Sequence, residues 1–227
     1  MKDYYFIYDT FSYVNAFILI ISGVISLIVL KRSNCKIIKI VAFYLLFCCF
    51  FDVLSRSVIL FSKYILHDYA NIFLRITFRL GELIIIGCLI NKYWLKSKIA
   101  WGLMLLCVFF LIYDLFTYQS KGILNYEAHA QTASTILLIG LIITNLLKQL
   151  NSSKDYDVTH QMLSMVFLAY FSINLIYTVI QNFIINQSFT NKSFVIFYSS
   201  YALLHIIYYF VLAFILLKNR NKVVGYN

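Results

Sequence analysis

Long apolar runs alternate with short polar connections from one end of the chain to the other. Each run has about 20 residues, the length that an α-helix needs to cross the hydrocarbon core of a bilayer. Only helices and closed barrels satisfy their backbone hydrogen bonds in lipid, and runs this long exclude barrel strands. The pattern therefore predicts an all-α polytopic membrane protein, a bundle of seven transmembrane helices forming a single domain over residues 1–227. The predicted spans are residues 11–31, 37–62, 70–91, 99–118, 129–149, 159–185 and 193–217.

Lysine and arginine residues in the connections predict how the bundle is oriented. With the N-terminus outside, twelve of them lie in the inner connections, the inner span ends and the C-terminal tail, against four in the outer segments. Cytoplasmic connections carry such an excess of positive charge. We therefore predict an N-terminus outside and a C-terminus inside. The abundance of Lys, Asn, Ile, Tyr and Phe is typical of an AT-rich bacterial genome, so we expect a multi-pass protein of the cell inner (cytoplasmic) membrane.

Composition indicates that the lipid bilayer is the main partner of this chain. Hydrophobic residues make up 62% and charged residues 12% of it, whereas a soluble domain carries about 25% charged residues. The net charge of +10 does not indicate nucleic-acid binding, because the basic residues lie mainly in the connections that set orientation. The five cysteines lie in spans or in an inner connection and include no C-x-x-C pair. We expect them to pack as small apolar residues, and we predict no metal and no cofactor.

Ionisable residues inside the spans are the strongest functional signal in the sequence. Each costs roughly 2.5–3.5 kcal/mol to insert, so its default interpretation is functional. They are Asp52, Arg56, Arg75, Arg79, Glu82 and Asp114. The first two are spaced i,i+4 in the second span, and the next three occupy one face of the third span. Three acids and three bases are typical of a mutually neutralising cluster.

Polar residues of later spans are expected at a comparable depth. Asn174 lies in the sixth span with tyrosines on the same face, and Tyr201 and His205 lie in the seventh. The inner halves of the spans are plainer, as in the segments LIIIGCLI and LIITNLL. We therefore predict that the polar residues line one cavity that opens to the outside.

Structural interpretations of the same residues stay open. The set of Asp52, Arg56, Arg79 and Glu82 can be a group of interhelical ion pairs that fixes helix register. Arg75 and Asp114 lie near the outer interface, where long side chains snorkel to water. His205 can be a hydrogen-bonded core histidine, and the tyrosines can be packing or interface anchors.

The residues of the chain fit some known membrane chemistries and do not fit others. A retinal protein needs a lysine within the last span, and none precedes Lys218 at its inner end. The four histidines show no spacing that gathers three zinc ligands. Acid–base chemistry by Asp52 and Glu82, as in a lipid-modifying hydrolase, stays an alternative. The chain has no proline to break helices around a substrate, which weighs against a rocking transporter.

Four segments carry a resemblance to known proteins: FFDVLSR in the second span, FRLGELIIIGCLINKYW in the third, LAYFSINLIY in the sixth and YALLHIIYYFVLAFILLKNR in the seventh. Together they resemble a group of small, uncharacterised seven-span integral membrane proteins of Bacteroidota-type bacteria. The resemblance covers most of the chain and implies a membrane-sensing partner of signalling proteins. The layout is also similar, more weakly, to seven-span carriers built as three-plus-one-plus-three.

The sequence thus favours a receptor-like or sensory membrane protein without catalytic residues. In this hypothesis a small polar or anionic ligand binds in the outer cavity, its anionic group facing the arginines and its other groups facing the later spans. The predicted ligand-binding residues are Asp52, Arg56, Arg75, Arg79, Glu82, Asn174, Tyr201 and His205. A cytoplasmic or membrane protein partner would dock on the basic inner connections. A small transporter or channel, a lipid-modifying enzyme and a subunit of a larger complex are the alternatives.

Overall fold

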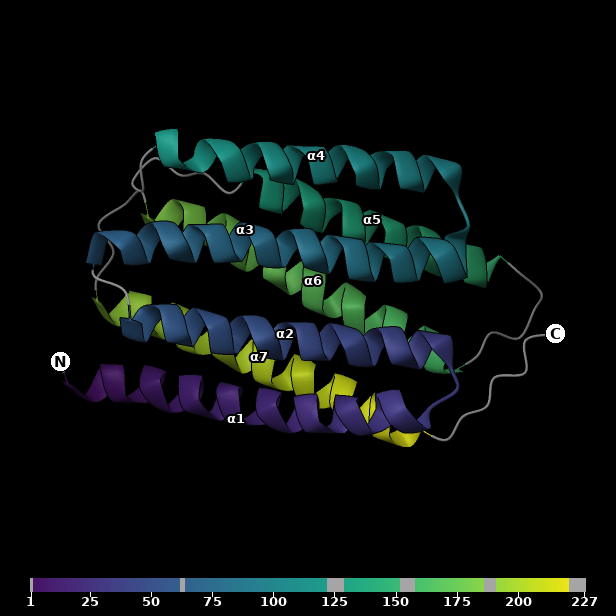
Figure 1. Ribbon diagram of the computed structural model, residues 1–227, viewed down its shortest axis with the longest axis horizontal. Coiled ribbons are helices and arrows are strands. Elements are labelled where there is room, and N and C mark those ends of the chain that lie inside the picture. Colours follow the sequence, from purple (N-terminus) through teal and green to yellow (C-terminus); the bar gives the residue numbers. More distant parts are fainter. Residues whose placement is uncertain (1, 62–63, 122–128, 152–157, 186–190, 221–227) are drawn as a thin grey trace. The chain divides into compact units, whose positions relative to one another are not determined.

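Seven long α-helices and one π-helical turn make up the part of the chain that the structure describes. The computed structural model describes residues 2–61, 64–121, 129–151, 158–185 and 191–220. The elements are α1 (Lys2–Arg32), α2 (Lys36–Phe61), α3 (Tyr64–Leu89), η1 (Ile90–Leu95), α4 (Lys98–Lys121), α5 (His129–Leu150), α6 (Val158–Ile185) and α7 (Asn191–Lys218) (Figure 1). Each predicted span falls on one of these helices, and the prediction of an all-α chain is confirmed.

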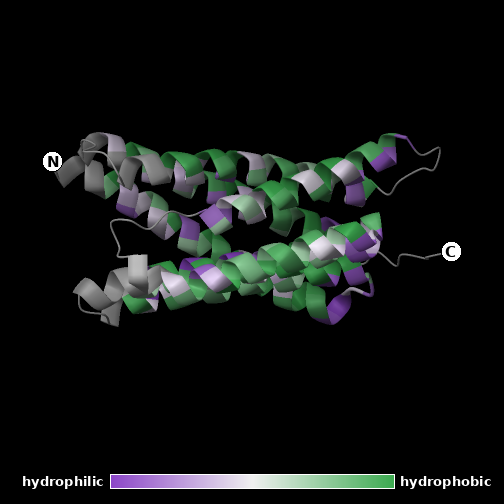
Figure 2. Ribbon diagram, turned by 90° about the horizontal axis from the view of Figure 1, so that it is seen from above, coloured by the Kyte–Doolittle hydropathy of each residue, from purple (hydrophilic) through white to green (hydrophobic). Residues whose placement is uncertain are grey.

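Six of the helices are long and apolar enough to cross a membrane, which confirms a membrane-type helical protein. Figure 2 shows apolar residues along most of their length. Large apolar side chains also face outward: Phe17 is 64% exposed, Phe109 63% and Phe116 80%. A soluble protein rarely exposes apolar surface so continuously, whereas lipid solvates it at no cost. The helix outside this group of six is α3, whose described part carries Arg75, Arg79 and Glu82.

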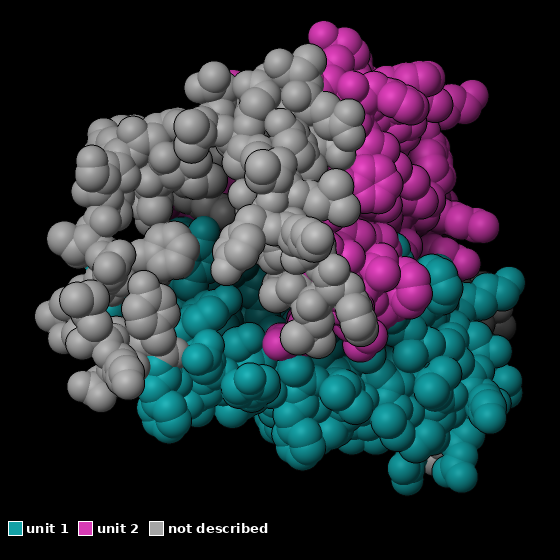
Figure 3. Space-filling model, turned by 60° about the vertical axis from the view of Figure 1, so that its left-hand side comes forward, with its two compact units in different colours: residues 1–49, 183–227 teal, residues 50–182 magenta. Residues whose placement is uncertain are grey.

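The chain forms two compact units, coloured separately in Figure 3. Unit 1 comprises residues 1–49 and 183–227, and unit 2 comprises residues 50–182. The helix α2 contributes its first half to unit 1 and its second half to unit 2.

In unit 1, small residues bring α1 against its neighbours. The buried Ser22 hydroxyl lies 2.8 Å from the Ile18 carbonyl of its own helix and 3.4 Å from the Tyr209 carbonyl of α7. A Cβ atom on Gly23 would meet the Cys49 sulfur of α2 at 3.3 Å. Small residues at such contacts let membrane helices approach closely, because they add little bulk between the backbones.

In unit 2, α3 packs against α4 and α5. The buried residues of α3 recur at a helical spacing: Ile76, Arg79, Glu82, Leu83, Ile86, Gly87 and Leu89. One close contact with α4 is at Gly87, where a Cβ atom would lie 2.5 Å from the terminal methyl of Met104. The face that α3 buries is therefore the face that carries its two paired charges.

The end of α3 differs from the simple loop that the predicted spans left between residues 91 and 99. The backbone widens into the π-turn η1, whose Lys96 amide bonds the Asn91 carbonyl at 2.6 Å, five residues back. Lys96 then adopts a left-handed conformation with φ 55°, and α4 begins at Lys98. Such π-turns are rare and are frequent at functional positions.

Candidate functional site

The centre of the candidate site is an ion pair on α3, between the Arg79 guanidinium and the Glu82 carboxylate. The i,i+3 spacing places both side chains on one helix face. Arg79 is only 7% exposed, and Glu82 is fully buried. Removing one partner of such a pair costs about 3–5 kcal/mol, because the other charge is left buried and uncompensated. Both partners belong to the same helix, so the pairing itself does not tie α3 to a neighbour.

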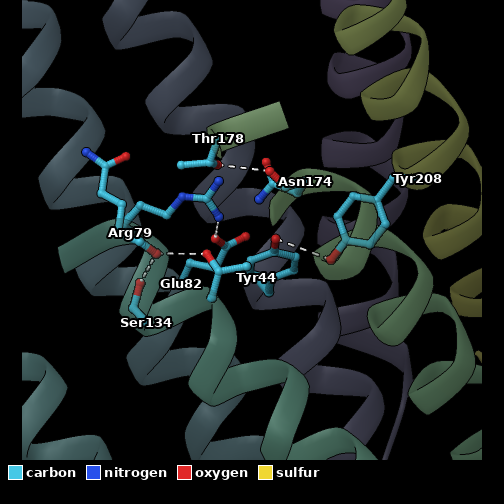
Figure 4. Close-up of polar contacts among 9 residues, drawn as sticks. Tyr44, Arg79, Glu82, Ser134, Asn174, Thr178 and Tyr208 are labelled. Carbon is cyan, nitrogen blue, oxygen red and sulfur yellow. Dashed lines mark hydrogen bonds and ion pairs between the residues drawn. The ribbon is translucent and has the colours of Figure 1, made fainter. Parts of the chain in front are cut away.

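Buried polar side chains of α5 and α6 lie around this ion pair (Figure 4). In α6, Asn174 is fully buried, and its backbone carbonyl accepts a hydrogen bond from the Thr178 hydroxyl at 2.9 Å. Figure 4 shows the side chains of Arg79 and Asn174 pointing toward each other, with Glu82 on the same side. The amide of Asn174 adds both donors and an acceptor to the charges of the ion pair.

The buried face of α5 carries a short polar patch in the first turns of the helix. Gln131, Ser134 and Thr135 are each at most 2% exposed. Both hydroxyls donate to the Gln131 carbonyl, at 2.8 and 2.9 Å. A hydroxyl whose proton is bound in this way keeps acceptor capacity on its oxygen. Three helices of unit 2 therefore place charged, amide and hydroxyl groups together inside a largely apolar molecule.

The second predicted pair, Asp52 and Arg56, forms on α2. The Arg56 Nε lies 2.8 Å from one Asp52 carboxylate oxygen, and a terminal nitrogen lies 3.4 Å from the other. Their side chains are 24% and 33% exposed, so this pair is more accessible than the pair on α3. The ring of Phe51 packs edge-on against Phe78 of α3 at a centroid distance of 5.7 Å. The two helices that carry the predicted charges are thus neighbours in unit 2.

Arg75 is exposed, one turn before Arg79. Asp114 of α4 is only 4% exposed, so its carboxylate lies inside the protein and does not extend from its surface.

Tyr201 and His205 belong to unit 1, so their presence in one cavity with the unit 2 residues stays a prediction. The Nδ1 atom of His205 lies 2.9 Å from the Tyr201 carbonyl. A carbonyl only accepts, so Nδ1 carries the proton in this contact. Also in unit 1, the buried hydroxyls of Tyr44 and Tyr208 form a hydrogen bond of 3.3 Å (Figure 4).

Polar residues are also buried at the end of α5 and the start of α6 in unit 2, in span halves that were expected to be plainer. A buried polar network joins η1, α5 and α6 there, and its centre is His160. The His160 Nε2 atom lies 3.3 Å from the Asn145 amide nitrogen and 3.1 Å from that of Gln149. The same Asn145 amide donates to the Ser164 hydroxyl at 3.1 Å. The Trp94 ring of η1 stacks on His160 at a centroid distance of 4.1 Å.

The sequence held a signal for this network, in two i,i+4 pairs at the ends of consecutive helices. Asn145 and Gln149 share one face at the end of α5, and His160 and Ser164 share one face at the start of α6. A short connection places those ends together. The asparagine of LIITNLL, Asn145, is therefore a buried hydrogen-bonding residue within an otherwise mainly apolar segment.

Fold and site together define a helical protein of the membrane type, with charged and polar groups gathered inside it. Comparison with protein-family models, with curated proteins and with solved structures finds no match to this chain. Function therefore has to be inferred from its own side chains.

Proposed function

We propose that this chain is a receptor-like, seven-span integral membrane protein that binds a small polar or anionic molecule at the Arg79–Glu82 pair. The observation that carries the proposal is the burial of this pair among amide and hydroxyl groups of α5 and α6. Ionisable groups held in a membrane protein mark a site by default, because apolar residues would fill the same space at a lower cost.

The chemistry of the pair suits a ligand with a planar anionic group. The Arg79 guanidinium presents five N–H donors in a rigid fork that matches a carboxylate or a phosphate. Glu82 holds this fork in place and balances its charge before a ligand arrives. Because the pair is neutral, a ligand that brings both charges, such as a zwitterion, preserves neutrality when it binds. Asn174 would then read a neutral polar group of the ligand.

The topology supports an outward-facing site. The helix α3 has 26 residues, enough to cross a bilayer, and with the six apolar helices it would bring the number of spans to seven. The Lys and Arg bias favours an N-terminus outside and a C-terminus inside. In that orientation Arg79 lies in the outer half of the bilayer, and the π-turn lies at the inner surface. A bacterial inner membrane is the location that this bias and the composition favour.

A receptor-like role is supported by what α3 connects. The helix runs from Glu82 to Ile90 over eight residues, about 12 Å at 1.5 Å per residue. It then enters η1, which stacks on α6 through Trp94 and His160. A ligand that shifts α3 would alter these contacts at the far end, because a packed helix moves as a rigid element. A protein partner at the inner surface could detect that change.

The proposal can be tested with the full chain in lipid nanodiscs. A panel of zwitterions, small carboxylates and phosphate esters would be screened by thermal unfolding. A ligand present at 100 times its Kd should add about 2.7 kcal/mol to the unfolding free energy. Any compound that stabilises the native chain should fail with Arg79→Gln and lose most of its effect with Arg79→Lys, which keeps the charge but not the fork. The matched control is Arg32→Gln, an exposed arginine at the end of α1.

Two results would contradict the proposal. Equal stabilisation of the native chain and Arg79→Gln would place binding elsewhere, and no stabilisation by any compound class would leave the pair without a ligand. Proteoliposome flux of a stabilising compound separates the main alternative, because a transporter moves the compound across the bilayer and a receptor does not.

A further inference from the structure

The turn between α3 and α4 gathers exposed lysines. Lys92 lies in η1, Lys96 follows it and Lys98 begins α4, and all three are exposed. Among the residues that the structure describes, none of the three forms an ion pair with an acidic side chain. A fourth lysine, Lys148 of α5, reaches the same turn. Like charges gathered in this way repel one another unless an anion lies among them.

Hydrogen bonds hold this lysine turn in one conformation. The fully buried Asn91 donates from its amide to the Ser97 carbonyl and accepts from the Ser97 amide, both at 2.9 Å. These two bonds close the turn across six residues. The Lys96 amide adds its bond to the Asn91 carbonyl. The lysines are thus displayed by an ordered backbone rather than by a loose connection.

Lys148 completes the arrangement from another helix. Its ammonium donates to the carbonyls of Trp94 and Leu95 at 3.3 and 3.2 Å. Leu95 directly precedes Lys96, so the charge of Lys148 lies at the same backbone turn. Trp94 is buried and stacked on His160, which anchors the turn to α6. Four positive charges, carried by η1, the residue that follows it, α4 and α5, therefore lie at or near one short segment.

The surface next to the lysines is apolar and faces outward. Along the first turns of α4, Ile99 is 77% exposed, Leu103 47% and Leu106 63%. Trp101 is 44% exposed, and the Lys92 ammonium lies 5.9 Å from the Tyr93 ring. Aromatic residues beside lysines mark the headgroup level of a bilayer. The lysines therefore lie where a lipid-facing surface reaches the membrane boundary.

We propose that the turn of Lys92, Lys96 and Lys98, with Lys148, is a binding site for the headgroup of an anionic phospholipid. The phosphate would be held by the lysines, and the acyl chains would lie along the exposed apolar face of α4. A headgroup fits better than a soluble anion because that apolar face is continuous with the lysines. The site does not depend on which ligand, if any, binds at Arg79, nor on which leaflet faces the turn.

The test measures lipid preference in the full chain. The protein would be reconstituted in nanodiscs of phosphatidylcholine with a minority of phosphatidylglycerol, and the lipid that it retains on release would be counted by native mass spectrometry. The native chain should prefer phosphatidylglycerol about tenfold over phosphatidylcholine. The variant Lys92→Gln/Lys96→Gln/Lys98→Gln should lose most of that preference, and the corresponding triple Lys→Arg variant should keep it.

The matched control removes three exposed charges at the end of α1 and the start of α2, as Lys31→Gln/Arg32→Gln/Lys36→Gln. It should retain the preference, because those residues belong to another turn. An equal loss of lipid preference in the two triple Gln variants would mean that the preference depends on the total positive charge of the protein, and it would overturn the proposed site. Competition by soluble glycerol phosphate as effective as that by phosphatidylglycerol would assign the site to a free anion and would overturn it too.

A second variant separates the order of the turn from its charge. Asn91→Leu keeps all four lysines but removes both bonds to Ser97. We expect the preference to fall about threefold, because each lysine near an anionic surface contributes only while it stays close to it. An unchanged preference in a variant whose turn has opened, measured by faster exchange of the Ser97 amide, would contradict an ordered site.

Discussion

Replacing Asn91 by leucine tests whether the π-turn is held by side-chain hydrogen bonds. Leucine has the same branching of side-chain heavy atoms as asparagine but neither a donor nor an acceptor, so both 2.9 Å bonds to Ser97 disappear. Each hydrogen bond contributes about 0.5–1.5 kcal/mol, and a buried group left without a partner costs about 1–3 kcal/mol. The Ser97 groups are partly buried, so we place the total loss at about 2–4 kcal/mol in the free energy of unfolding.

The substitution Asn91→Asp makes the reasoning more specific. Aspartate keeps the acceptor for the Ser97 amide but replaces the donor with a second oxygen, 2.9 Å from the Ser97 carbonyl. It also places a charge where the side chain is fully buried. We therefore expect Asn91→Asp to lose more stability than Asn91→Leu, although it retains one of the two bonds.

Two measurements check this prediction. The full chain in mild detergent would be unfolded by titration with a denaturing detergent, which gives the difference in unfolding free energy between the variants. Exchange of the Ser97 amide gives the local opening, which should accelerate about 30-fold for a loss of 2 kcal/mol. The control is Asn34→Leu, at an exposed residue between α1 and α2, which should change neither. A loss below about 0.5 kcal/mol for Asn91→Leu, with normal exchange at Ser97, would refute the reasoning.

Three further substitutions test the packing of unit 2 around this turn. His160→Ala removes the ring stacked on Trp94 and the acceptor for two amides, and should cost about 1–3 kcal/mol in thermal unfolding, with a changed near-ultraviolet circular dichroism signal from Trp94. An unchanged signal would mean that the stacking does not occur in solution. Gly87→Leu places a side chain against α4, where a Cβ atom alone would already lie 2.5 Å from the Met104 methyl, and should cost about 1–3 kcal/mol of unfolding free energy. The control Gly140→Leu should cost almost nothing, because a Cβ atom there meets nothing within 4 Å. Equal effects of the two in the same unfolding titration would contradict the packing of α3 on α4. Lys148→Met keeps the apolar stem but loses both carbonyl contacts, and should cost about 0.5–1.5 kcal/mol of unfolding free energy. Unchanged amide exchange at the turn would mean that Lys148 does not hold the turn.

The helices could be predicted from sequence because apolar runs of span length have few other stable arrangements. The predicted span at 11–31 lies inside a helix that begins at Lys2, since the aromatic segment before it contains no helix breaker. The spacing of Arg79 and Glu82 predicted one helix face, and the structure pairs them on that face. Periodicity along a single helix carries this information.

The network around His160 could not be predicted in the same way. The hydrogen bond between Asn145 and His160 joins residues 15 positions apart, and the stacking joins η1 to α6, which two whole helices separate in sequence. Periodicity reports which residues share a face but not which face meets another. The π-turn depends on the side chain of Asn91 reaching Ser97, a choice that neither residue type indicates alone. Whether Tyr201 and His205 approach Arg79 depends on contacts between units, so it stays a prediction.

The charges on α3 explain why this helix differs from the other six. A helix that carries Arg75, Arg79 and Glu82 is poorly stabilised by lipid alone, because each ionisable group costs free energy in an apolar solvent. It becomes stable when its charged face turns toward the polar groups of α5 and α6 and its apolar residues pack on α4. The helix is therefore held by its neighbours more than by the bilayer. A helix held in this way responds to a change at its charged face by moving against those neighbours, and the π-turn at its end is where that movement would reach the membrane surface.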